Sequence, residues 1–103
     1  MAEVKYEGWT NYETWAVKLW MDNEEPSYNY WKERTEEIAK DAKGDQYTTS
    51  ERMAVHNLAT ALKDEHEEAV PDLEGFAGDL LMTALGSVNW YEIAKSLLED
   101  YEP

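Results

Sequence analysis

The stretch 11-NYETWAVKLW-20 places two tryptophans and a tyrosine within ten residues of a chain that is otherwise polar and acidic. Apolar side chains recur there at helical spacing, at Tyr12, Trp15, Ala16, Leu19 and Trp20. This spacing is typical of one face of an α-helix. We therefore expect a helix that ends near Asn23, and we expect Tyr12, Trp15 and Leu19 to lie in the core.

Breakers and caps divide the rest of the chain into further helices. Pro26 is suited to open a helix that runs to Lys43, and Pro71 ends the helix that follows residues 48–51. Gly86 ends a fourth helix, and Asn89 caps a fifth, with Glu92 at its third helical position. The sequence therefore predicts an all-α fold, a compact bundle of four to five short helices forming a single domain over 1–103.

Three details of this bundle are also expected. Thr10 with Glu13, and Thr48 with Glu51, have the form of capping boxes, and Asp72 can cap the fourth helix. The fourth helix is the most apolar segment and is expected to be central, despite two glycines that would let a neighbouring helix approach closely. Its inward residues are expected to be Leu73, Phe76, Ala77, Leu80, Leu81, Ala84 and Leu85. The short stretch 3-EVKY-6 is compatible with a brief strand.

The charge balance is the strongest global feature of the chain. Among 103 residues, 23 Asp and Glu stand against nine Lys and Arg, for a formal net charge of −14. Such a charge repels nucleic acid and anionic membranes and attracts basic partners. No basic patch that would bind nucleic acid directly is visible. Solubility alone, or adaptation to salt, is the alternative explanation of the charge.

The sequence offers little catalytic chemistry. It has no cysteine, which excludes disulfides, thiol catalysis and cysteine-bound zinc. His66 falls on the apolar side of its helix, where a packing role is expected, and His56 is the other histidine. The run 64-DEHE-67 is suited at most to weak binding of a divalent ion, because neighbouring helical residues diverge. We expect no enzyme, no cofactor and no metal site, and with no signal or membrane-spanning segment we expect a cytoplasmic protein.

Acidic clusters and possible aromatic anchors are the candidate binding residues. The clusters are Glu24 and Glu25, then Asp64, Glu65, Glu67 and Glu68, and finally Glu99, Asp100 and Glu102. Two clusters lie at expected helix C-termini, where acids oppose the helix dipole, so stability alone would not favour them. The aromatics expected to be exposed are Trp9, Trp20 and Tyr30, and Trp and Tyr are common interface anchors.

Two stretches of the chain carry a resemblance. With 11-NYETWAVKLWMDN-23 and 88-VNWYEIAKSLLED-100, the sequence resembles small, mostly uncharacterised proteins of bacteriophages and other mobile elements. The resemblance implies a genomic setting and no catalytic residue. Small acidic proteins of that setting often look like DNA mimics that inhibit host defences, including restriction and CRISPR effectors.

These observations lead to one expected function and its alternatives. We expect a non-enzymatic inhibitor whose carboxylates mimic DNA phosphates and occupy a basic nucleic-acid-binding surface of a host defence complex. The alternative is an interaction or assembly module, with a homodimer as one form, that docks through exposed aromatics. A hydrolase or nuclease accessory is a third hypothesis, which would depend on His56 or His66.

Overall fold

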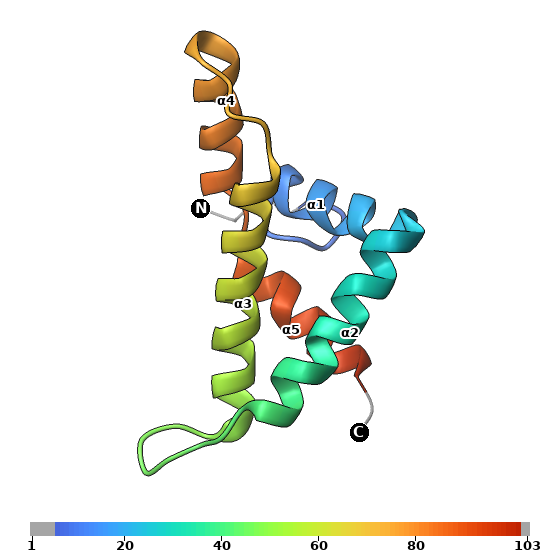
Figure 1. Ribbon diagram of the computed structural model, residues 1–103, viewed down its shortest axis with the longest axis vertical. Helices are drawn as coiled ribbons and strands as arrows, with labels where there is room; N and C mark the ends of the chain where they lie inside the picture. The colour runs from blue at the N-terminus through green and yellow to red at the C-terminus, as the bar shows by residue number, and fades with distance from the viewer. Residues whose placement is uncertain (1–5, 102–103) are drawn as a thin grey trace.

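A computed structural model describes residues 6–101 and contains five α-helices within that range (Figure 1). In chain order they are α1 (Tyr12–Asn23), α2 (Glu25–Asp41), α3 (Ser50–Ala69), α4 (Gly75–Gly86) and α5 (Trp90–Asp100). The all-α bundle expected from the sequence is confirmed. Residues 3–5 of the expected short strand lie outside the described range, and Tyr6 forms only an isolated bridge with Trp9.

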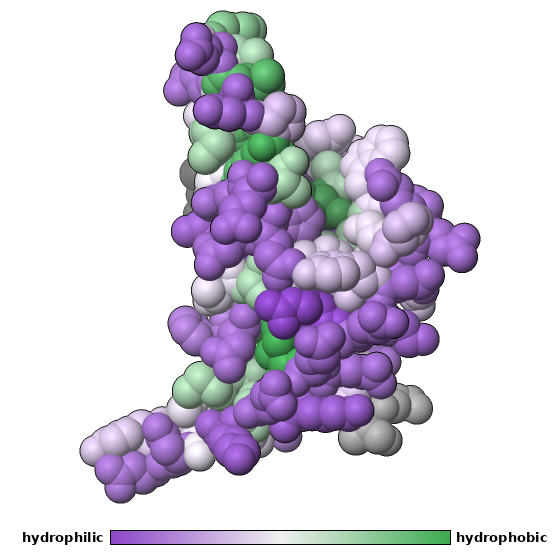
Figure 2. Space-filling model, in the orientation of Figure 1, coloured by the Kyte–Doolittle hydropathy of each residue, from purple (hydrophilic) through white to green (hydrophobic). Residues whose placement is uncertain are grey.

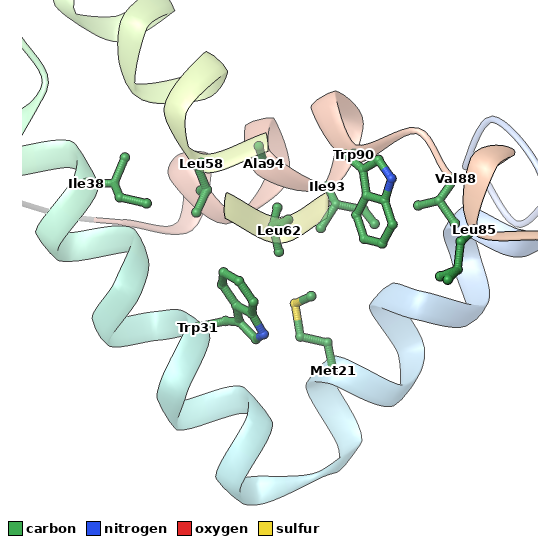
Figure 3. Packing of buried hydrophobic residues seen from close by; sticks show 10 residues of the cluster. All are labelled: Met21, Trp31, Ile38, Leu58, Leu62, Leu85, Val88, Trp90, Ile93 and Ala94. Atoms are coloured by element: carbon green, nitrogen blue, oxygen red, sulfur yellow. The ribbon is translucent and has the colours of Figure 1, made fainter. Parts of the chain in front are cut away.

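The core lies where α2, α3 and α5 meet, and α3 and α5 share the largest helix–helix interface. Leu58 and Leu62 of α3 lie against Ile93 of α5, and all three side chains are fully buried (Figure 3). Trp31 of α2 and Met21 of α1 close the core from the other side. Each of these buried side chains contributes about 1.5–3 kcal/mol by leaving water. Helix α5 takes part in this core and packs on α1, α2 and α3.

The aromatic face of α1 does not point into this core, and the expectation for it was wrong. Tyr12 is 54% exposed and Leu19 is 37% exposed, while Trp15 is half-buried. Tyr12 and Trp15 pack with Tyr6 in an aromatic cluster separate from the buried core, with ring centroids 4.8 to 5.5 Å apart. These aromatics therefore pack mainly on one another, at the distances that edge-to-face and offset contacts prefer.

The buried face of α1 is instead made of Thr14, Lys18 and Met21. The Lys18 ammonium reaches the Asp22 carboxylate at 2.6 Å, which compensates for its burial. Thr14 is fully buried because its hydroxyl joins two helix ends. It donates to Asn11 Oδ1 at 2.6 Å and accepts from the Asn89 backbone N–H at 2.8 Å. These polar contacts turn α1 away from the face that its apolar periodicity predicts.

The caps of α1 and α5 are linked to each other. Asn89 caps α5 as expected, since its Oδ1 accepts from the Glu92 N–H at 3.0 Å. Its amide also donates to Thr10 Oγ1 at 3.1 Å, and Glu92 Oε1 accepts from the Thr10 N–H at 2.9 Å. Glu92 thus satisfies the N–H that Glu13 was expected to satisfy, because the two helix N-termini lie together.

The other expected caps were each misplaced. Asn11 caps α1 in place of Thr10, and Thr49 caps α3 in place of Thr48. Glu74 occupies the N-cap of α4 in place of Asp72, without a side-chain hydrogen bond. Neighbouring residues with similar capping chemistry differ little in propensity, so the tertiary contacts select among them.

The expectation that α4 is the central helix was also wrong. Only Gly78 and Leu85 of α4 are buried, and its first turns project beyond the end of α3 (Figure 1). A Cβ at Gly78 would lie 2.0 Å from the Leu73 carbonyl oxygen, so this glycine accommodates the segment that leads into α4 and not a neighbouring helix. Gly75 has φ +70°, a conformation that favours glycine.

Candidate protein-docking surface

The projecting helix and the segment before it expose large apolar side chains, which we call the α4 apolar surface. It consists of Leu73, Phe76, Leu80 and Met82. Phe76 is 80% exposed, and Leu80 and Met82 are each more than half exposed. Figure 2 shows apolar residues beside hydrophilic ones at the top of the molecule, above a body that is mostly hydrophilic on this face. A cluster of this kind on a small domain is typical of an interaction surface.

Acidic side chains adjoin the α4 apolar surface where α3 ends. Asp64, Glu67, Glu68 and Asp72 line a hollow of about 470 Å³, and Met82 of α4 lines the same hollow. We call these four carboxylates the acidic corner. Among the described residues, Glu67 forms the only ion pair of the corner, to Lys63 at the outer limit of 4.0 Å. The corner therefore presents carboxylates with almost no local neutralisation.

The sequence around this corner is free of basic residues over a long stretch. Residues 64–94 contain eight Asp and Glu and neither Lys nor Arg. This stretch includes the end of α3, the whole of α4 and the start of α5. The α4 apolar surface is therefore flanked along the chain by negative charge alone, which will attract cations and repel anions.

The other acidic clusters are placed among basic residues or apart from the corner. Asp100 lines a hollow that also contains Lys18 and Lys32, and Glu99 lines another with Lys40 and Arg52. Figure 1 places the ends of α3 and α5, and the turn between α1 and α2, at separate points of the molecule. Glu24 and Glu25 lie exposed at that turn, and Glu102 lies outside the described residues. The three clusters do not form one continuous array.

Glu65 is not available as a free carboxylate, unlike its neighbours in sequence. Its Oε2 accepts from Arg34 Nε at 3.1 Å, and its Oε1 accepts from the Tyr30 hydroxyl. The hydrogen bond to Glu65 raises the pKa of Tyr30 above its ordinary value, because it favours the neutral phenol. This triad joins α2 to α3, so Glu65 has a structural role that sequence proximity to the corner did not reveal.

The three expected aromatic anchors have different surroundings. Trp20 is 64% exposed, as expected. Trp9 is half-buried and packs against the core, so the expectation that it is exposed was wrong. Tyr30 is exposed on one side and held by Glu65 on the other, with its ring edge-on to Trp31 at 5.1 Å. Only Trp20 of the three stands free in the way that an anchor requires.

His66 is a packing histidine, as its position on the helix predicted. Its ring lies between Trp31, at a centroid distance of 5.5 Å, and Trp90, at 5.2 Å. Its Nδ1 lies 2.7 Å from the Leu62 carbonyl oxygen. The ring therefore packs on two tryptophans, and one of its nitrogens lies at hydrogen-bond distance from a backbone oxygen. Within the described part of the chain, no three His, Asp or Glu side chains converge in a way that would hold a metal ion.

The apolar surface of α4 was missed at the level of sequence, although its residues were noted as apolar. The helix carries apolar side chains on all sides, a pattern typical of a helix buried in a core. Periodicity does not reveal whether the covering surface belongs to the same chain. The one local indication is the segment 70-VPDLE-74, in which Pro71 ends α3 and an acidic linker leads into α4.

The geometry defines a class of protein: a small acidic helical bundle, described over residues 6–101, with an apolar helix that projects from it. The chain belongs to a family of unknown function, DUF7249, whose model matches residues 2–101. No curated protein and no solved structure shows significant similarity to it. None of the helices that the structure describes is long and apolar enough to cross a membrane.

Proposed function

We propose that the protein is a non-enzymatic inhibitor that binds the basic, nucleic-acid-binding surface of a protein in a bacterial defence complex. The observation that carries the proposal is the run of residues 64–94, with eight carboxylates and no basic residue, four of whose carboxylates line or adjoin the end of α3. The resemblance to small proteins of mobile elements suggests restriction or CRISPR effectors as the class of target.

The physical basis is the replacement of phosphates by carboxylates. Lysines and arginines that bind DNA displace the counterions condensed around its phosphates, which favours binding. A dense set of carboxylates offers the same basic side chains a favourable electrostatic contact of a similar kind. Binding of this kind weakens steeply as salt rises. The acidic corner is the strongest candidate surface, because Glu65 is engaged with Arg34 and because Asp100 shares its hollow with two lysines.

The test is capture of partners from a bacterial lysate on the immobilised protein, with a salt gradient and a challenge by duplex DNA. Basic nucleic-acid-binding proteins that elute at moderate salt and are displaced by DNA would support the proposal. Partners that remain through high salt and ignore DNA would contradict it.

Matched variants locate the contact. Asp64→Asn with Glu68→Gln should abolish capture, whereas Glu33→Gln with Asp41→Asn, the same change of charge on α2, should preserve it. The first pair lies near the C-terminus of α3, where acids oppose the helix dipole. Its neutralisation is therefore not expected to destabilise the fold, so a loss of capture would reflect lost binding.

A second candidate function is supported by Trp20, which is 64% exposed. It is an interaction or assembly module that docks through exposed aromatics. In that case Trp20→Ala would abolish capture of a partner that resists high salt, and the variants of the acidic corner would bind normally.

A further inference from the structure

Among residues 6–101, no other element covers the outer side of α4. Gly78 and Leu85 are buried and Leu81 packs against the core, so the inner side of α4 is already engaged. Phe76 and Leu80 lie four residues apart and both are exposed, on the outer side. A helix that is apolar all round is normally covered on every side. The outer side of α4 is therefore suited to packing against another molecule.

We propose that the α4 apolar surface and the acidic corner together dock a basic amphipathic helix of a partner protein. The apolar stripe of that helix would cover Phe76 and Leu80, and lysines or arginines beside the stripe would face Asp79, three residues after Phe76, and Asp72 of the corner, next to Leu73. The inference rests on the proposed function, for which it names the contact surface and the chemistry of the partner.

The dimensions of α4 favour a helix as the occupant. Its 12 residues correspond to about 18 Å, or three turns. Side chains four apart form a ridge that fits the groove of a second helix. Recognition of an amphipathic helix through apolar anchors at this spacing is a common mode of peptide binding. Met82 lies on the side of α4 that faces the corner, away from Phe76 and Leu80, and offers a flexible side chain that adapts to different apolar neighbours.

The charge around α4 disfavours the other possible occupants. A second copy of this chain would bring an identical acidic surface against the first, because a twofold interface pairs a patch with itself. Asp72, Glu74 and Asp79 lie in or next to α4, with no basic residue within 64–94 to compensate. An anionic bilayer would be repelled in the same way. A basic helix satisfies both the apolar and the electrostatic character of the surface.

The experiment uses the full chain and a fluorescein-labelled leucine–lysine peptide of about 18 residues, with leucines at helical spacing. The control peptide has the same composition, with its leucines distributed around the helix. Fluorescence polarisation measures both affinities across a salt series. We expect the patterned peptide to bind at least about tenfold more tightly, which corresponds to about 1.4 kcal/mol. Equal affinities would overturn the inference, because charge alone would then explain binding.

Variants test the apolar part of the surface. Phe76→Ser with Leu80→Ser should weaken binding of the patterned peptide by about tenfold or more, as for anchor residues of interfaces. The more conservative Leu80→Ala should act in the same direction. Tyr47→Ser, which removes an 84% exposed aromatic from the loop between α2 and α3, is the matched control and should have no effect. Unchanged binding by both α4 variants would overturn the inference.

The remaining outcomes identify other occupants. A dimer in sedimentation that disappears in the Phe76→Ser, Leu80→Ser variant would assign the surface to a second copy and overturn the inference. Binding to phosphatidylcholine vesicles that depends on α4 would overturn it as well.

The proposed function can fail independently of this inference. If the patterned peptide binds α4 but DNA displaces no lysate partner, the docking surface stands and the mimicry does not. If DNA displaces partners from both the wild type and the α4 variants, the mimicry stands and the docking surface does not.

Discussion

Helices α4 and α5 are nearly equal in length, at 12 and 11 residues, and have opposite places in the fold. The more apolar helix, α4, projects from the bundle, whereas α5 lies at its centre and carries Lys95, Glu99 and Asp100. Burial follows the arrangement of apolar residues more closely than their number. In α5 they form one stripe with charges opposite, so a single face can be covered completely.

The neighbours of each helix explain the rest of the difference. The N-terminus of α5 is joined to that of α1 through Thr14 and Asn89, which holds α5 across α3. The N-cap of α4 has no side-chain hydrogen bond, and its leading segment packs back onto Gly78. The radius of gyration is 14.7 Å, against about 13 Å for a typical domain of this length, which is consistent with a projecting helix.

The largest contrast is expected between the effects on stability of truncating one apolar side chain in each helix. Ile93→Ala in α5 should lower the free energy of unfolding by about 2–4 kcal/mol, because it leaves a cavity in a fully buried position. Leu80→Ala in α4 should change it by less than about 0.5 kcal/mol, because Leu80 is exposed. Urea unfolding followed by circular dichroism measures both. Equal costs would show that α4 is covered in solution.

The linked caps should rank next. Thr14→Val preserves shape but removes the hydroxyl, leaving the Asn89 N–H without its acceptor. We expect a loss of about 1–3 kcal/mol in the free energy of unfolding. Thr14→Ser retains the hydroxyl and should be closer to the wild type. If Thr14→Val were as stable as the wild type, the junction of α1 and α5 would not contribute to stability.

A local effect is expected at the start of α4. Gly75→Ala places a side chain at φ +70°, at a cost of about 1–2 kcal/mol. Because α4 contributes little to the core, hydrogen exchange should accelerate in α4 and remain unchanged in α5. Gly86→Ala is the control, since a Cβ there meets open space. Accelerated exchange in α5 as well would contradict the independence of the two helices.

The smallest effect concerns the triad of Tyr30, Arg34 and Glu65, which joins α2 to α3. The raised pKa of Tyr30 means that its bond to Glu65 stabilises the fold below about pH 10, and that this contribution is lost as pH rises through the raised pKa. Tyr30→Phe should remove that alkaline loss. Ultraviolet titration should show one fewer late-titrating tyrosine in the variant. If the phenol lost in the variant were one that titrates with the other tyrosines, the bond would be excluded in solution.

The sequence predicted the helices well and their faces less well. Pro71, Gly86 and Asn89 act locally, so they bounded helices correctly. The inner face of α1 was mispredicted because a threonine and a lysine occupy it, through hydrogen bonds to residues distant in sequence or on the next turn. The two stretches that carry the resemblance, 11–23 and 88–100, meet at these linked caps. Their polar residues therefore have a structural role that no short motif discloses.

The candidate surface was predicted in its charge and missed in its apolar part. The cluster at 64–68 was identified by composition, since charge is additive along the chain, but the engagement of Glu65 by Arg34 required α2 and α3 to be placed side by side. By itself, the sequence determined the net charge, the number of helices to within one and where most of them end, because these depend on composition and on local backbone chemistry. Only the tertiary structure decided which apolar helix is covered, because the burial of a helix depends on which surfaces of the other helices are available to pack against it.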